Sequence, residues 1–270
     1  MLKKEIIIRT KKELYLRLFG EHTSKYGGLG VDFKEIKEYE EGDLIAHINW
    51  SKYAKSQELV VNRYDEQRQL NIVLVYLNSG SLEFGEKKRK KETAQELLVS
   101  LSYLAVSKAD SLTTLFFSKE CEHFLKPSKS KRVVDINYET AKKIKHLGKS
   151  IDYKKLVDFL AYKIKKRSII FLIGDFLEAF SLSALHRHEI YALVVRDKAE
   201  EELELLGERS LTDCNSLETQ KISVSSAVAK RYNDMVKREY LKLKEQNLGV
   251  EFLKIYTCDD SIKRLKELYV

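Results

Sequence analysis

The chain has 270 residues, of which 43% are hydrophobic, so it is long enough to bury a sizeable core within one large domain. Its net charge of +8 arises from 49 Lys and Arg against 41 Asp and Glu. A lysine-rich solvated surface accounts for this excess, although the excess would also permit binding of an acidic partner or nucleic acid. No apolar run approaches the roughly 20 residues of a membrane-spanning helix, and no signal-peptide pattern opens the chain. We therefore expect a cytoplasmic protein.

The first 69 residues read as an extension that precedes the main domain. Residues 6–19 place apolar side chains at helical spacing, and a glycine-rich connection follows at residues 25–30. Residues 59–64 predict a strand that leads toward the central one. We divide the chain into an extension at residues 1–69 and an α/β domain at residues 70–270.

A central strand is predicted at residues 72–77, a nearly unbroken apolar run rich in β-branched and aromatic residues that suits burial on both faces. The small residues at 78–81 favour a turn, and a long helix is expected from about residue 86. A strand, a turn and a helix make the first unit of an α/β sheet, whose ligands bind at the carboxyl ends of the strands.

The rest of the chain alternates as an α/β domain does. Helices are predicted at residues 86–109, 133–147, 152–166 and 227–246. Strands are predicted at residues 112–117, 121–125, 168–173, 190–195, 220–224 and 250–256. The predicted fold class is α/β, a three-layer doubly wound and mostly parallel sheet with an N-terminal β-containing extension.

Several motifs resemble those of the bacterial family called "domain of unknown function 58". They are Gly30 with Asp32-Phe33, Glu38-Tyr39-x-x-Gly42-Asp43, Ile48-x-Trp50, Arg196-Asp197, Leu211-Thr212-Asp213 and the ending Tyr256-Thr257-Cys258-Asp259-Asp260. The resemblance implies a von Willebrand factor A-like fold. It also implies a non-catalytic protein-interaction module that partners a MoxR-type AAA ATPase in a chaperone-like system that matures or remodels a client protein.

The same resemblance implies a degenerate metal-ion-dependent adhesion site. Domains of the von Willebrand factor A type commonly hold Mg²⁺ through an Asp-x-Ser-x-Ser loop, a Thr and a later Asp. Here the matching metal positions are Ser79, Ser81, Ser150 and Asp175, while Leu77 stands where the first Asp is expected. Because Mg²⁺ is held by few carboxylates, losing one weakens binding, and we expect weak Mg²⁺ binding or none, and no other cofactor.

Partner contacts are predicted at the same crevice, through Asn78, Lys87, Lys88, Arg89 and Asp175. The basic run at residues 87–91 favours an anion over a dication, so the crevice is expected to accept a carboxylate or phosphate of the partner. The alternative is that the serines are turn residues and Asp175 is a helix cap.

Two other functions remain open at this point. The first is a basic nucleic-acid-binding module, although the basic run lacks interleaved aromatic residues for base stacking. The second is a metal-dependent hydrolase, which is disfavoured because no general base is placed beside the metal position. We therefore predict that the chain is not an enzyme.

Overall fold

The computed structural model describes residues 6–7, 32–41, 43, 45–65, 69–178, 180–202, 207–214 and 217–269. These residues fall into two compact units, the smaller within Phe19–Gln69 and the larger within Met1–Leu18 and Leu70–Val270. Residues 6–7 are helical, but the rest of the predicted helix at residues 6–19, and the predicted connection at residues 25–30, lie outside the described residues.

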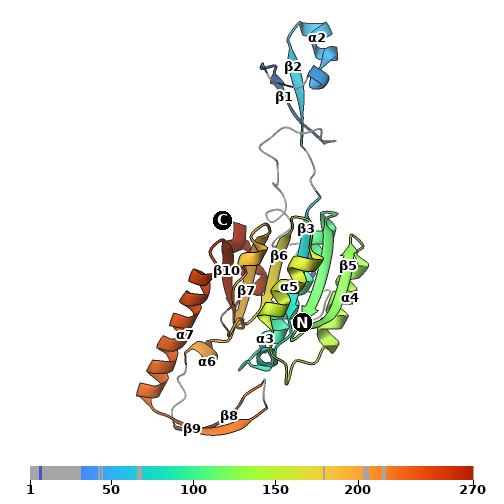
Figure 1. Ribbon diagram of the computed structural model, residues 1–270. Coiled ribbons are helices and arrows are strands. Elements are labelled where there is room, and N and C mark those ends of the chain that lie inside the picture. Colours follow the sequence, from blue (N-terminus) through green and yellow to red (C-terminus); the bar gives the residue numbers. More distant parts are fainter. Residues whose placement is uncertain are drawn as a thin grey trace. The chain divides into compact units, whose positions relative to one another are not determined.

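The smaller unit is a two-stranded antiparallel sheet, β1 at Asp32–Glu38 and β2 at Val60–Asp65 (Figure 1). Between the strands lie a 3-10 turn, Ile45–His47, and the helix α2 at Trp50–Ser56. The Asn49 side chain caps α2 by accepting the backbone N–H of Lys52 at 3.0 Å. The strand predicted at residues 59–64 is confirmed as β2.

The larger unit is built on a six-stranded sheet in the order β10-β7-β6-β3-β4-β5 (Figure 1). Its strands are β3 (Asn71–Leu77), β4 (Ser111–Phe117), β5 (Cys121–Ser128), β6 (Ile169–Gly174), β7 (Glu189–Arg196) and β10 (Val250–Tyr256). All neighbouring strands run parallel except β5, which pairs antiparallel with β4 at one edge. The predicted α/β class with a mostly parallel sheet is confirmed.

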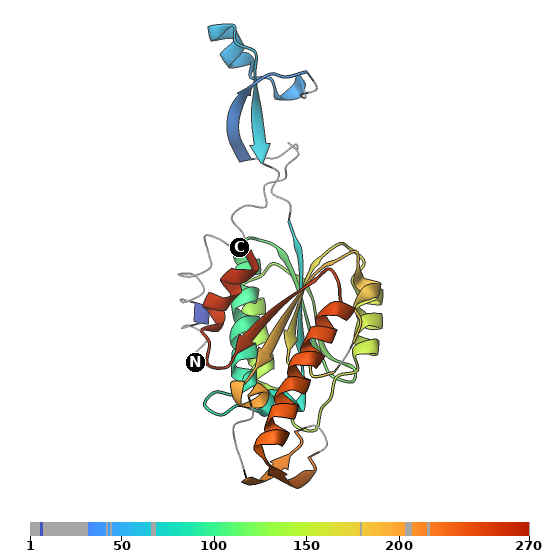
Figure 2. The same ribbon diagram turned by 90° about the vertical axis from the view of Figure 1, so that its left-hand side faces the viewer.

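Helices cover both faces of this sheet, and Figure 2 shows α3 and α8 on one face and α7 on the other. The helices are α3 (Lys90–Ser107), α4 (Arg132–Lys143), α5 (Tyr153–Lys163), α6 (Lys198–Glu201), α7 (Ser226–Gln246) and α8 (Ser261–Arg264). Val73, Val75 and Leu77 of β3 pack with α5 and with Leu243 of α7. Alternate residues of a strand point to opposite faces of the sheet, so Leu74 is buried on the other face. Burial on both faces explains the unbroken apolar run of β3.

The helix after the central strand begins at Lys90, four residues later than predicted. A 3-10 turn, Gly80–Glu83, follows β3, and the chain then folds back so that the Lys90 N–H donates to the Phe84 carbonyl at 2.8 Å. Gly85 makes this fold possible, because its φ is +150° and a Cβ there would lie 2.2 Å from the Lys88 carbonyl oxygen. Two other helices end before the predicted residue. The helix predicted at residues 133–147 ends at Lys143, and the one predicted at residues 152–166 ends at Lys163.

The sequence pattern missed two strands, β1 of the smaller unit and β8 (Gly207–Thr212) of the larger one. β8 pairs antiparallel with β9 (Thr219–Val224) as a separate two-stranded sheet. Only β9 was predicted, because β8 carries polar residues at most positions and shows no apolar alternation. No helix among the described residues is long and apolar enough to cross a membrane.

Candidate functional site

The first loop of the site follows β3 at the carboxyl edge of the sheet. Its Asn78 N–H donates to the Phe117 carbonyl at 2.7 Å, which ties the loop to the end of β4. The 3-10 turn that follows brings the hydroxyl oxygens of Ser79 and Ser81 to 2.8 Å of each other. Both serines are buried, so their hydroxyls are available only from inside the crevice.

The second loop, residues 148–150, reaches the first through the backbone. Gly148 has φ +76°, and the Gly80 N–H donates to the Lys149 carbonyl at 2.7 Å. Ser150 therefore lines the same small cavity as Ser79, Ser81 and Asp175. This cavity has a volume of about 20 Å³, which is room for about one water molecule. The structure thus brings together the four residues of the predicted metal site.

The third loop follows β6 and supplies Asp175, which is 2% exposed. Ser81 donates its hydroxyl hydrogen to Oδ2 of Asp175, and Ser79 Oγ lies 3.4 Å from the same oxygen. The next residue, Phe176, has φ +51°, a left-handed conformation that is rare for a bulky side chain. Its ring stacks with Phe180 at a centroid separation of 5.5 Å, so packing holds the strained turn. Strain of this kind clusters at functional sites.

Leu77 occupies the position where the first metal-binding Asp was expected. Its side chain is fully buried in the core that packs against α5. It also lies over Gly174 of β6, where an added Cβ would meet the Leu77 Cβ at 2.8 Å. A carboxylate at this position would be buried without a partner, which explains why an apolar side chain suits this packing.

Lys90 and Glu200 belong to the site, and the sequence analysis did not single them out. The Lys90 side chain is fully buried, and its Nζ lies 3.5 Å from Oδ2 of Asp175 and 2.7 Å from Oε1 of Glu200. A signal was present, because Lys90 precedes Ala94 by four residues and Leu97 by seven, which places it on the buried face of α3.

The residues predicted to contact a partner differ in their surroundings. Asn78 is fully buried, and its Nδ2 donates to the Glu122 carboxylate at 3.0 Å. Lys88 pairs with Glu96 and Arg89 pairs with Glu83, each at 2.7 Å, whereas Lys87 is exposed. Lys91 also pairs with Glu83, at 2.8 Å. Carboxylates therefore offset most of the positive potential of the run at residues 87–91, and a role of these residues in partner binding stays a prediction.

A buried histidine lies beside the first loop. His146 Nε2 is 3.1 Å from the Tyr76 hydroxyl oxygen, and Nδ1 is 3.4 Å from Oε1 of Glu83. Burial lowers the pKa of His146 to about 4, although the Glu83 carboxylate opposes this shift. Burial also raises the pKa of the Tyr76 hydroxyl, so at neutral pH a protonated hydroxyl and a neutral imidazole share this hydrogen bond. The Arg89 and Lys91 side chains lower the pKa of Glu83 against the effect of its own burial.

The crevice does not fit Mg²⁺ well. Within the described residues, no group of three or more His, Cys, Asp or Glu side chains is placed to hold a metal ion. Mg²⁺ lies about 2.1 Å from its oxygen ligands, and the Oδ2 of Asp175 that would bind it already has the Lys90 ammonium 3.5 Å away. Two positive charges would compete for one carboxylate oxygen.

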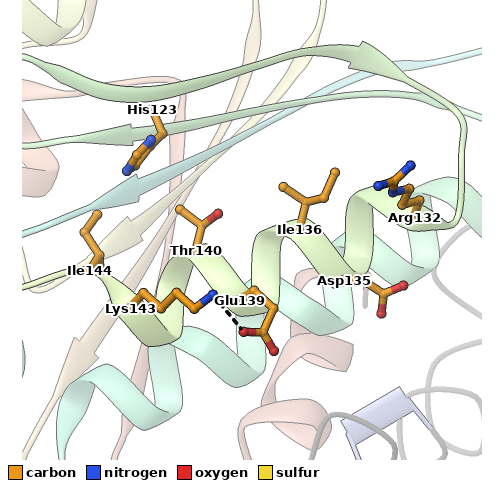
Figure 3. A pocket seen from close by; sticks show the side chains of 8 residues that line it. All are labelled: His123, Arg132, Asp135, Ile136, Glu139, Thr140, Lys143 and Ile144. Atoms are coloured by element: carbon orange, nitrogen blue, oxygen red, sulfur yellow. Dashed lines mark ion pairs between the residues drawn. The ribbon is translucent and has the colours of Figure 1, made fainter.

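The larger cavities lie elsewhere. One of about 500 Å³ is lined by residues of α4 and by His123 of β5, and Figure 3 shows its side chains along the helix. Four of its eight lining residues are charged, and Lys143 pairs with Glu139 at 3.6 Å across one turn of α4. None of its lining residues belongs to the predicted site. A second cavity, of about 160 Å³, lies between α7 and the segment that follows β6 and shares Leu177 and Glu178 with the crevice.

The chain is similar to two mycobacterial proteins, both called uncharacterized: Rv1480 of Mycobacterium tuberculosis and Mb1516 of Mycobacterium bovis. Each is 23% identical over 229 residues, which cover 82% of this chain and 72% of the relative.

Two solved structures are also similar. One is the conserved hypothetical protein BatB from Bacteroides thetaiotaomicron, with 10% identity and a TM-score of 0.46 over 73% of this chain and 96% of that one. The other is an aerotolerance-related membrane protein from Bacteroides fragilis, with 11% identity and a TM-score of 0.46 over 74% of this chain and 96% of that one.

A family described as "Protein of unknown function DUF58" matches residues 35–241. The match covers most of the chain and includes the crevice, its buried lysine and the whole of the basic run. The chain therefore belongs to the DUF58 family.

Proposed function

We propose that this chain is a non-catalytic protein-interaction module that works with a MoxR-type AAA ATPase to mature or remodel a client protein. The observation that favours docking over chemistry is the size of the crevice, about 20 Å³, against the roughly 300–1,000 Å³ of typical small-molecule sites. A small substrate has no room there, whereas a side chain of a partner can rest on its rim.

The rim offers a small docking surface of mixed character. Leu177 is 48% exposed and Glu178 is exposed, and both line the crevice directly beyond Asp175. The buried Ser79, Ser81 and Asp175 would then act mainly by holding the turn that presents this rim. Leu177 and Glu178 would give a partner one apolar and one charged contact beside the crevice.

The proposal includes a von Willebrand factor A-like fold for residues 70–270, with residues 1–69 as an extension, and a cytoplasmic location. The strand order, with one antiparallel strand at the β5 edge, supports this assignment. So does the placement of Ser79, Ser81, Ser150 and Asp175 at one carboxyl edge. The MoxR-type partner comes from the family resemblance in the sequence, and the docking role comes from the crevice.

Affinity capture tests the proposal. The protein serves as bait in an extract of its source cell, with and without Mg-ATP, and bound proteins are identified by mass spectrometry. Two variants probe the crevice, Leu177→Glu on the rim and Asp175→Ala within it. Asp158→Ala is the matched control, because Asp158 is an exposed aspartate of α5 that does not line the crevice.

Capture of an AAA ATPase by the wild type and by Asp158→Ala, with weaker capture by both crevice variants, would support the proposal. If the wild type and every variant capture the ATPase equally well, the interface lies elsewhere on the protein. If nucleic acid is recovered instead, with binding that falls steeply as salt rises, the alternative of a basic nucleic-acid-binding module replaces it. The ion pairs of Lys88, Arg89 and Lys91 speak against that alternative, because they leave less unpaired positive charge on this surface.

A further inference from the structure

Lys90 is an unusual place for a positive charge. It is the first residue of α3, where the helix dipole favours anions and disfavours cations. Its side chain is fully buried, and an isolated buried ammonium is costly. Helix stability therefore does not account for a lysine at this position. The groups that contact the Lys90 ammonium must account for it.

Those partners are two carboxylates, Asp175 in the loop after β6 and Glu200 in the short helix α6. Nζ of Lys90 lies 2.7 and 2.9 Å from the two carboxylate oxygens of Glu200, and 3.5 Å from Oδ2 of Asp175. Asp175 is 3% exposed and Glu200 is 14% exposed at their side chains, so the three charges share an interior with little screening by water. One ammonium thus holds together two carboxylates that would otherwise repel each other.

A divalent ion in such a crevice would bind the carboxylate oxygens directly, and its positive charge would balance theirs. Here Oδ2 of Asp175 accepts from Ser81 and lies next to the Lys90 ammonium. We infer that the Lys90 ammonium is a built-in cation of this crevice, which supplies the counter-charge for Asp175 that a divalent metal would supply, so that the crevice forms without metal. The inference concerns the isolated protein and does not rest on the proposed partner.

Thermal unfolding of purified protein tests this, in millimolar MgCl₂ or MnCl₂ against NaCl of equal ionic strength. The variants are Lys90→Met, Asp175→Asn and the double variant. Lys91→Met is the matched control, since it removes a neighbouring lysine whose partner Glu83 keeps Arg89. Breaking a buried charge cluster by removing one partner is strongly destabilising, so we expect Lys90→Met to lower Tm by roughly 5–10 °C without metal.

The wild type should show no Tm shift specific to the divalent ion. Lys90→Met should regain part of its lost Tm in Mn²⁺ or Mg²⁺, and the double variant should not, because the negative charge that attracts the ion is gone. The Lys90→Met effect should also be smaller in the Asp175→Asn background.

A wild-type Tm that rises with Mg²⁺, and loses this rise in Asp175→Asn, would overturn the inference. So would a Lys90→Met variant that is as stable as Lys91→Met in the absence of metal. If Lys90→Met does not fold well enough to measure, Mn²⁺ titration of the wild type followed by electron paramagnetic resonance decides, because binding of one ion per chain that Asp175→Asn abolishes contradicts a built-in cation.

Discussion

Acidification should destabilise the protein through His146. The imidazole is buried and neutral at neutral pH, because burial lowers its pKa to about 4. Its Nε2 lies 3.1 Å from the Tyr76 hydroxyl oxygen, and protonation would place a positive charge in this buried pair. Because the folded state disfavours protonation of this side chain, the free energy of unfolding falls as the pH falls.

The direction and size of the effect follow from the two pKa values. In the unfolded chain the imidazole titrates near 6.5 and in the folded protein near 4, so between these values the unfolded state binds the additional proton. The His146 contribution to stability is complete above about pH 6.5, falls as the pH falls through the window, and changes no further below about pH 4. The free energy of unfolding should drop by about 2 kcal/mol between about pH 7 and pH 5 from this group.

Urea denaturation followed by far-ultraviolet circular dichroism measures this slope for the wild type and for His146→Gln. The fluorescence of Trp50 is unsuitable, because that residue lies in the smaller unit. His186→Gln, at an exposed histidine, is the control. His188, whose pKa burial also lowers, adds a slope of the same sign to all three proteins, and His186→Gln reduces it only by removing the smallest cause of the His188 shift. A His146→Gln variant with the full wild-type slope would refute the reasoning.

Three further changes test packing and backbone, each by the same denaturation assay at neutral pH. Gly85→Ala should cost about 2 kcal/mol or more, because the new Cβ would lie 2.2 Å from the backbone oxygen of Lys88 at φ +150°; unchanged stability would mean that this loop relaxes freely. Gly174→Ala should cost about 1–3 kcal/mol by forcing Leu77 aside, and a neutral result would show spare room in the core. Asn247→Ala should cost about 2–3 kcal/mol, because the buried amide bonds one N–H and two carbonyl groups at 2.7 to 2.9 Å; a loss below 0.5 kcal/mol, roughly that of a surface change, would contradict this.

The sheet could be predicted because its central strands are unbroken apolar runs. The apolar runs at residues 72–77 and 168–173 are buried on both faces, which is typical of a parallel sheet covered by helices. The family resemblance named Ser79, Ser81 and Asp175 as one site. Their meeting agrees with the rule that the carboxyl ends of parallel strands share one edge of the sheet.

The role of Lys90 was not predicted, although its spacing to Ala94 and Leu97 places it on the buried face of α3. Lys87 precedes Ala94 by seven residues, so a helix that began at residue 86 would place Lys87 on the same face. The fold-back at residues 84–89, which Gly85 makes possible, moves the helix start to Lys90, and Lys87 is exposed. β8 was missed for a related reason, since its residues carry no apolar pattern and it forms a strand through its pairing with β9.

A buried lysine at the crevice also makes a natural reporter of motion. Amine reagents reach Lys90 only when the segment around it opens, whereas Lys87, three residues earlier, is exposed in the closed state. The ratio of their modification rates, corrected for the reactivity of a free lysine, would therefore measure the equilibrium between closed and open crevice, as protected amides do in hydrogen exchange. Lys90 is thus a probe of local opening at the crevice, and Lys87 is its internal reference.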